Sequence, residues 1–241
     1  MARFDITFSS WALGHGTHVT AIIPDGERKE PCRNLYLLHG LGDNETTWAR
    51  RTSIERYAEK YGIAVIMPDC GRSFYTDMKY GENYYTYLTK ELPKKMAEYF
   101  GLSEERKYNF ISGNSMGGYG SLKAALRENG KYFAVAGLSA ATDAKIRRFE
   151  DVMLPIFGED FEVKPEDDLF ALAESLKDSP EKPRVFLGIG LNDFLYEENQ
   201  RFRKSLTECG FDVTYRESPG DHCWDFWDEY IQYALEWALN E

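Results

Sequence analysis

The sequence predicts an α/β fold in which helices cover both faces of a mainly parallel sheet. Short β-rich runs alternate with helical patterns along nearly the whole chain, which is typical of parallel strands joined by crossover helices. The first 23 residues differ, because two runs of alternating apolar and polar side chains flank Gly14-His15-Gly16. That pattern predicts an antiparallel hairpin in front of the parallel part.

The strands are indicated by short apolar runs that end at Gly, Pro, Asp or Ser, as buried strands do. The hairpin is expected at 3–9 and 17–23, and the later strands at 35–38, 63–67, 108–111, 134–138, 185–189 and 211–215. Helical patterns fill the intervals at 48–61, 84–100, 115–129 and 193–209. Pro93 is expected to kink the second of these. A closing helix from Trp224 to Ala238 carries its apolar side chains near one face.

Length and composition favour one domain spanning residues 1–241. The 241 residues are 43% hydrophobic and 29% charged, which is the composition of a folded globular protein. Residues 140–180 are the least regular stretch and fall between two expected strands. We expect a small lid-like insertion there.

Charge and hydropathy argue against several classes of partner. A formal net charge of −11 repels nucleic acid and anionic lipid, and no segment has the apolar length needed to span a bilayer. The N-terminus has no apolar stretch that would indicate a secretory signal. The four cysteines form no C-x-x-C pair. We therefore expect a cytoplasmic protein with reduced thiols and no metal site, and the sequence leaves open whether it forms a homo-oligomer.

The stretch from Gly113 to Gly117 matches the G-x-S-x-G nucleophile elbow. It lies between an expected strand and an expected helix, which is the context that the motif requires. Glycines are needed because the serine is held in a strained turn whose neighbours pass close to other backbone, where a Cβ would clash. The motif predicts Ser115 as the nucleophile of a serine hydrolase.

A serine hydroxyl is a weak nucleophile at neutral pH and needs a neighbouring base. His222 is the only histidine after the elbow, and it lies in a turn that follows the last expected strand. The chain order Ser, acid, His is that of α/β-hydrolases, whose histidine loop reaches the carboxyl end of the sheet beside the elbow. His222 is therefore the expected general base.

The acid is expected after a strand between the serine and the histidine. Asp193 follows the strand predicted at 185–189 and is the first candidate. It could instead cap the next helix, a role for which Asn192 competes. Weaker candidates are Asp160, Asp167 and Asp168.

The segment from Leu38 to Asp43 ends the first parallel strand, where this fold takes one amide of the oxyanion hole. The other amide comes from the residue after the nucleophile. Leu41 and Met116 are the expected backbone donors. A histidine at the position of His39 is more typical of a side chain that bonds the neighbouring loop and braces the hole than of a second base.

These motifs resemble the esterase D-like group of α/β-hydrolases, and within it the tributyrin esterases. Four segments carry the resemblance: Leu37 to Asn44 with Trp48, Met67 to Asp69 followed by Ser73 to Asp77, Ile111 to Gly120, and Gly220 to His222 with Trp224. The resemblance covers nearly the whole chain and implies a short-acyl carboxylesterase without a cofactor. Many relatives have leucine before the serine, where this chain has Asn114, and the change is expected to alter the polarity beside the nucleophile.

We therefore expect a Ser-His-Asp enzyme that cleaves acetyl to butyryl or aryl esters of small molecules. The insertion at 140–180 is too short and too charged to build the broad apolar lid of a lipase, which favours a small pocket. The expected pocket residues are His39, Phe74, Tyr75, Asn114 and Phe157. The rival interpretations are a thioesterase like S-formylglutathione hydrolase, a feruloyl esterase, and a non-catalytic binding protein on the same scaffold.

Overall fold

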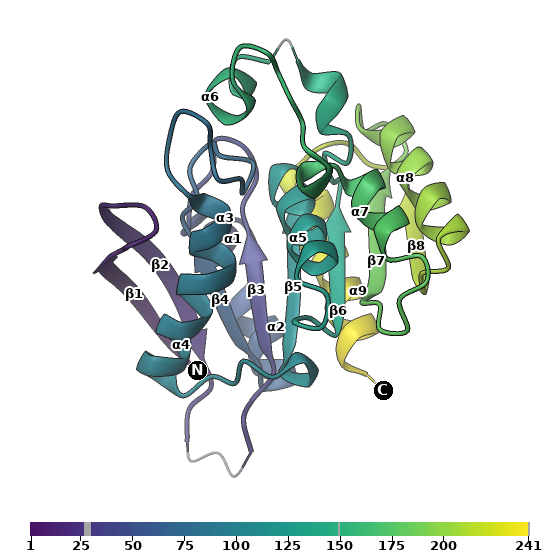
Figure 1. The fold of residues 1–241 in the computed structure, drawn as a ribbon. Coiled ribbons are helices and arrows are strands. Elements are labelled where there is room, and N and C mark those ends of the chain that lie inside the picture. Colours follow the sequence, from purple (N-terminus) through teal and green to yellow (C-terminus); the bar gives the residue numbers. More distant parts are fainter. Residues whose placement is uncertain (27–29, 149, 241) are drawn as a thin grey trace.

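The computed structural model describes residues 1–26, 30–148 and 150–240. Within these ranges the chain forms one eight-stranded sheet with the order β1-β2-β4-β3-β5-β6-β7-β8, seen edge to edge in Figure 1. The strands are β1 (Ala2–Ser9), β2 (Gly16–Ile23), β3 (Asn34–Leu38), β4 (Ala64–Pro68), β5 (Asn109–Asn114), β6 (Ala134–Leu138), β7 (Arg184–Gly190) and β8 (Val213–Ser218).

The register of the sheet confirms the predicted α/β fold. β1 pairs with β2 in antiparallel fashion, and β2 pairs antiparallel with β4. The other pairs are parallel, from β4 through β3, β5, β6 and β7 to β8. The last strand runs to Ser218, beyond the end predicted at 215. β8 lies at one edge of the sheet, where polar residues are tolerated. The apolar pattern used for the prediction therefore covers only the first half of this strand.

The helices agree with the predicted pattern in place but not always in length. They are α1 (Thr47–Arg51), α2 (Ile54–Tyr61), α3 (Tyr84–Thr86), the π-helical η1 (Tyr87–Glu91), α4 (Leu92–Phe100), α5 (Met116–Arg127), α6 (Met153–Phe157), α7 (Leu169–Ser175), α8 (Tyr196–Glu208) and α9 (Trp224–Leu239), with short 3₁₀ turns η2 (Arg106–Tyr108), η3 (Ala144–Arg147) and η4 (Pro165–Asp167). The helix predicted at 48–61 is divided into α1 and α2.

The helix predicted at 84–100 contains a π-helical turn, η1, directly before the segment that begins with Leu92 and Pro93. Proline has no N–H to bond the carbonyl of Thr89, and its ring would press on that carbonyl in a regular α-helix. Widening the helix at η1 relieves the contact. Lys131 Nζ donates a hydrogen bond to the Thr89 carbonyl instead, so the freed acceptor is satisfied.

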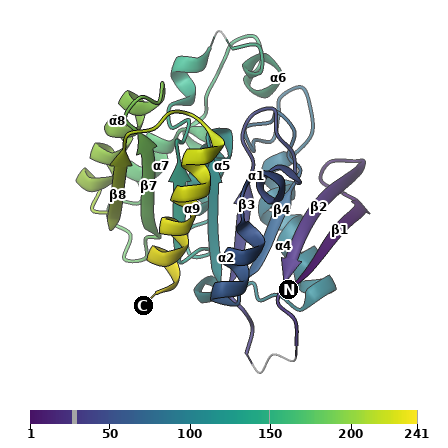
Figure 2. The same cartoon turned by 180° about the vertical axis from the view of Figure 1, so that it is seen from behind.

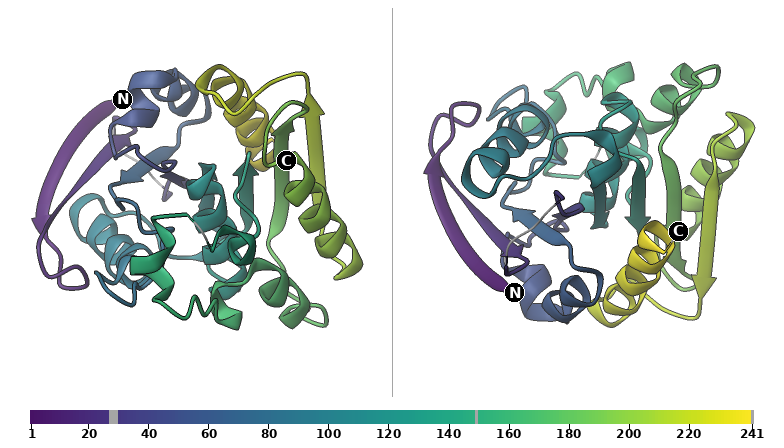
Figure 3. Two further views of the ribbon diagram at one scale, coloured as in Figure 1. Left: turned by 90° about the horizontal axis from the view of Figure 1, so that it is seen from above. Right: turned by 90° about the horizontal axis from the view of Figure 1, so that it is seen from below.

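Two apolar layers enclose the sheet. Figure 1 shows α4, α5, α7 and α8 on one face, and Figure 2 shows α1, α2 and α9 on the other. Figure 3 shows the sheet running between these layers when seen along its strands. From Met116 to Leu126, α5 is buried along its whole length, so it is the central helix of its layer.

In Figure 1, the part of the irregular stretch at 140–180 that contains α6 lies at the top, above the carboxyl ends of the parallel strands, whereas α7 lies lower, beside α5 and α8. The whole stretch contains η3, α6, η4 and α7. Its anchor to the core is the wholly buried Lys123 of α5, whose Nζ lies 2.6 Å from Thr76 Oγ1 and 3.1 Å from Asp167 Oδ1. The Tyr119 hydroxyl donates to the Asp167 carbonyl at 2.5 Å. A buried ion pair therefore joins the stretch to the central helix.

Replacing Lys123 with Met should lower the free energy of unfolding by about 3 kcal/mol at pH 7, because Asp167 is left buried without its main partner. The control is Lys177→Met, which removes an exposed pair with Glu174 and should cost at most about 1 kcal/mol.

Burial lowers the pKa of Lys123 from 10.5 to about 8, so between these values the unfolded chain holds a proton that the folded chain has lost. Urea denaturation should therefore show the stability advantage of the wild type over Lys123→Met growing as pH rises from 8 to 10, and a shrinking advantage would contradict the assignment.

Candidate active site

The elbow lies between β5, which ends at Asn114, and α5, which begins at Met116. Ser115 joins them with φ +53° and ψ −116°, a backbone conformation that side-chain-bearing residues rarely adopt. A Cβ on Gly117 would lie 2.3 Å from the Leu38 carbonyl oxygen, which no side chain could tolerate. The glycine thus lets α5 begin directly against the end of β3. The strained turn presents the serine hydroxyl at the carboxyl ends of the central strands.

The structure brings Ser115, His222 and Asp193 together. His222, in the loop between β8 and α9, has its Nε2 3.0 Å from Ser115 Oγ. Its Nδ1 lies 2.9 Å from Oδ2 of Asp193, which follows β7. This arrangement allows the imidazole to accept the serine proton at Nε2 while its Nδ1–H donates to the carboxylate.

Asp193 is almost wholly buried, with 4% of its surface exposed. Burial opposes its ionisation, but hydrogen bonds from His222, the Leu195 amide and the Ser139 hydroxyl outweigh burial and lower the pKa of Asp193. The Leu195 amide lies 2.9 Å from Oδ1. The carboxylate is therefore held ionised and oriented toward the imidazole.

The three other acid candidates lie elsewhere. Asp167 bonds Lys123, as described above, and Asp168 caps α7 and pairs with Lys145. Asp160 is exposed beside Lys79. Each of these carboxylates has a local structural partner outside the serine and histidine pair.

Ser139 and Trp227 lie near Asp193 and belong to no motif recognised in the sequence. Ser139, which directly follows β6, is wholly buried with φ +45°. Its hydroxyl accepts a hydrogen bond from Trp227 Nε1 at 3.1 Å and is one of the groups that lower the pKa of Asp193. A signal was present in the sequence, because a polar residue at the carboxyl end of a central parallel strand faces the site edge of such a sheet.

Aromatic rings flank the imidazole. The Phe194 ring centroid lies 4.6 Å from that of His222, and the Trp227 ring meets it edge to face at 4.9 Å. Phe194 is 74% exposed whereas Trp227 is buried. The two rings limit rotation of the imidazole and leave one side of it near solvent.

The loop that should supply an oxyanion amide is braced by His39, as expected. The buried His39 accepts a hydrogen bond at Nε2 from the Cys70 amide at 3.0 Å, and its Nδ1 lies 2.9 Å from the Gly40 carbonyl. Burial lowers the pKa of His39, which favours the neutral ring that these two contacts require. The Tyr75 hydroxyl donates to the His39 carbonyl at 2.8 Å. Leu41 follows this braced segment, and Met116 is the first residue of α5.

A cavity of about 400 Å³ opens at the serine. Its lining residues are Gly40, Leu41, Asp43, Asn114, Ser115, His222, Cys223, Trp224 and Trp227. Of the five residues expected to line the pocket, Asn114 is among them. His39, Phe74 and Tyr75 are buried behind the cavity.

The difference at residues 74 and 75 has a backbone cause. Phe74 and Tyr75 have φ of +48° and +50°, and this turn directs their rings into the core. Phe74 packs against Tyr119 with ring centroids 5.7 Å apart, and Tyr75 fills the space beside Gly120. Both rings therefore pack against α5 and are not among the residues that line the cavity at Ser115.

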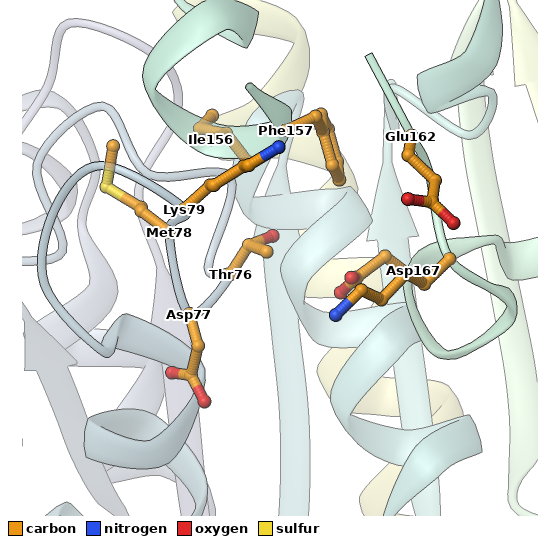
Figure 4. A pocket seen from close by; sticks show the side chains of 9 residues that line it. Thr76, Asp77, Met78, Lys79, Ile156, Phe157, Glu162 and Asp167 are labelled. Atoms are coloured by element: carbon orange, nitrogen blue, oxygen red, sulfur yellow. The ribbon is translucent and has the colours of Figure 1, made fainter. Parts of the chain in front are cut away.

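Phe157 lines a second cavity, of about 410 Å³, under the irregular stretch. Figure 4 shows this cavity, with Lys79 extending toward Phe157 and with Asp167 and Glu162 on the opposite side. Ser115 and His222 do not line it. Phe157 is therefore not among the residues that line the cavity at Ser115.

Across the described ranges, no group of three or more His, Cys, Asp or Glu residues is placed to hold a metal ion. The cysteines at 32, 70, 209 and 223 are not joined in disulfides. No helix among these residues is long and apolar enough to cross a membrane.

Comparison with known proteins gives similarity along the entire chain. The model of a family described as "Putative esterase" matches residues 10–237. An acetyl esterase of Caldicellulosiruptor saccharolyticus is 32% identical over 260 residues, covering 98% of each chain. Substrate-bound FphF, the fluorophosphonate-binding serine hydrolase F of Staphylococcus aureus, has a TM-score of 0.93 at 34% identity and covers 100% of this chain and 99% of its own. The S-formylglutathione hydrolase FrmB of the same organism has a TM-score of 0.90 at 34% identity, with 99% of both chains covered.

An organophosphonate that reacts with activated serines should label the wild type once, and Ser115→Ala should abolish the label. Only a serine whose hydroxyl is deprotonated by a neighbouring base reacts readily. Ser112→Ala is the matched control, since this wholly buried serine lies on β5, the strand that leads to Ser115, and outside the cavity lining. Intact mass spectrometry measures the label, and a labelled Ser115→Ala protein would exclude Ser115 as the reactive group.

Proposed function

Because this chain belongs to the "Putative esterase" family and is a serine carboxylesterase of the esterase D-like group, we propose that it hydrolyses short-chain acyl esters, acetyl to butyryl, and aryl esters. The chemistry proceeds through an acyl-enzyme on Ser115. One observation carries this proposal: His222 bridges Ser115 and Asp193 at 3.0 and 2.9 Å at the wall of a single cavity.

In the first half-reaction, Ser115 Oγ attacks the ester carbonyl carbon while His222 Nε2 takes the hydroxyl proton. The backbone amides of Leu41 and Met116 donate hydrogen bonds to the carbonyl oxygen as it becomes negative, a contribution worth about 3 to 4 kcal/mol for each donor. The carbon–oxygen bond to the alcohol then breaks, and the alkoxide takes the proton from His222. The alcohol leaves and Ser115 carries the acyl group.

In the second half-reaction, water enters the cavity and gives a proton to His222 as it attacks the acyl carbon. The tetrahedral intermediate collapses, Ser115 Oγ recovers the proton, and the carboxylic acid departs. Asp193 keeps the same imidazole tautomer through both halves. Every proton therefore passes through one nitrogen, His222 Nε2.

The preference for short acyl groups is supported by the size and walls of the cavity. Its volume of about 400 Å³ must hold both parts of an ester, and the indole rings of Trp224 and Trp227 close one side. An acetyl esterase is among the relatives that are similar over nearly the whole chain. A cytoplasmic location is also proposed, and four cysteines without disulfide bonds support it.

Thioester hydrolysis is the second candidate, favoured by the similarity to an S-formylglutathione hydrolase. The same three residues would act on a thiolate leaving group. Comparing kcat/KM for S-formylglutathione and phenyl acetate distinguishes the two. A non-catalytic scaffold protein is disfavoured, because the residues proposed as nucleophile, base and acid are all present and in contact.

Ser139→Ala should lower kcat for phenyl acetate by roughly ten-fold, because Asp193 loses a hydroxyl that helps to lower its pKa and Trp227 Nε1–H loses its acceptor. Asp193→Asn should lower kcat by about 10⁴. Since both act through the same imidazole, the double variant should be little slower than Asp193→Asn alone. Asp160→Asn, at an exposed position, is the control. Fully multiplicative losses in the double variant would show that Ser139 does not act through Asp193.

Acetyl, propionyl and butyryl esters of 4-nitrophenol should be cleaved well, and kcat/KM should fall sharply beyond about eight carbons. Each methylene that fits adds roughly 0.8 kcal/mol of transfer free energy, whereas one that overruns the cavity stays in solvent or displaces side chains. The measurement is kcat/KM below the aggregation concentration of each ester. A value that kept rising through dodecanoyl esters would refute the small acyl pocket.

A further inference from the structure

The side chain of Asn114 is an unusual feature of the floor of the cavity. It is wholly buried, directly precedes the nucleophile and lines the cavity that contains Ser115. Within the described ranges, neither its Oδ1 nor its Nδ2 has a hydrogen-bond partner. A buried amide without partners costs free energy of folding, so its presence beside the nucleophile calls for a ligand group that supplies both a donor and an acceptor.

A second polar group faces the same space. A Cβ built on Gly40 would lie 3.0 Å from Asn114 Nδ2 and 3.3 Å from Asp43 Oδ2, so the amide and the carboxylate converge on one side of Gly40. Asp43 is half-buried and also lines the cavity. Burial raises the pKa of Asp43, although His39, Arg51 and Arg50 oppose the shift. The carboxylate would therefore gain from a hydrogen-bond donor on a bound molecule.

We propose that Asn114 and Asp43 form a subsite for a hydroxyl group carried by the alcohol part of the ester, next to the scissile bond. This rests on the proposed function, because acetyl to butyryl groups carry no hydrogen-bonding group beyond their carbonyl. Polar groups in the cavity must then serve the alcohol. The preferred substrates are short-chain monoesters of diols and polyols.

The chemistry of the two side chains selects a hydroxyl over charged groups. A hydroxyl accepts from Asn114 Nδ2 and donates to Oδ1 or to the Asp43 carboxylate. An ammonium group only donates, which would leave Nδ2 unpaired, and a carboxylate would be repelled by Asp43. Trp224 and Trp227 line the same cavity and offer apolar surface to the carbon atoms of the alcohol.

The test compares 2-hydroxyethyl acetate with 2-methoxyethyl acetate. Their leaving groups carry the same electron-withdrawing oxygen, and only the first carries a hydroxyl donor. The wild type is expected to have about ten-fold higher kcat/KM for the hydroxyethyl ester, since an unmade hydrogen bond to a buried group costs a factor of this size. Because the comparison is a ratio within one enzyme preparation, it is insensitive to the active fraction.

Two variants and a control assign the preference to the subsite. Asn114→Leu, of similar size, should bring the ratio close to one, and Asp43→Asn should reduce it several-fold by weakening the acceptor. The control is Ser112→Ala. Ser112 is also wholly buried on β5, and its hydroxyl has no partner among the described residues, but it does not line the cavity. Its loss should leave the ratio at the wild-type value.

Three results would overturn the subsite: a wild-type ratio near one, a ratio unchanged in Asn114→Leu and in Asp43→Asn, or faster cleavage of acetylcholine than of 2-hydroxyethyl acetate. The last would replace the hydroxyl with a cation as the recognised group. Equal cleavage of the two test esters removes this proposal alone. If the folded wild type cleaved none of the acetates, the proposed function would fail as well.

Discussion

The contact on which the site depends is the approach of α5 to the end of β3. Gly117 meets the Leu38 carbonyl so closely that a Cβ there would lie 2.3 Å from the oxygen, and one on Gly113 would lie 2.5 Å from Gly117 itself. This packing leaves Ser115 no room for an ordinary turn and holds it at φ +53°. The strain is sustained because the whole helix behind it is buried, so Ser115 is positioned by the core rather than by a mobile loop.

The same packing organises the neighbouring loops. Tyr75 fills the space that a side chain at Gly120 would occupy, and its hydroxyl holds the His39 carbonyl at 2.8 Å. The expected oxyanion loop is thus braced against the helix that begins at the nucleophile. On the other side, the parallel strands β6 and β7 deliver Ser139 and Asp193 to the same edge of the sheet. The hydrogen bonds that Asp193 accepts keep its buried carboxylate ionised, and the ring of Trp227 restrains His222.

Local motifs and chain order were enough for the sequence to single out Ser115, His222 and Asp193, which the structure brings into contact. The elbow was recognisable because its glycines are spaced for one turn, and His222 and Asp193 followed from their places after successive strands. Ser139 was not predicted. Its place after a central parallel strand was the available signal, but a single serine there does not reveal its partner until the neighbouring strand is known. Phe74 and Tyr75 were expected at the pocket as bulky aromatic residues that would close a small space. Their positive φ values, which turn the rings inward, cannot be recognised from residue types that rarely adopt them.

The buried polar side chains of this protein differ in what satisfies them, and the difference separates structural from functional positions. Lys123 is wholly buried, yet Thr76 and Asp167 satisfy its ammonium group, so its role is to attach the insertion. Ser112 and Asn114 both lack partners among the described residues, which shows that an unpaired group alone does not indicate a ligand. Asn114 differs because it borders the cavity and faces a carboxylate across Gly40. The unpaired amide of Asn114, one residue before Ser115, lowers the free energy of unfolding. Such departures from the local rules of stability are typical of functional sites.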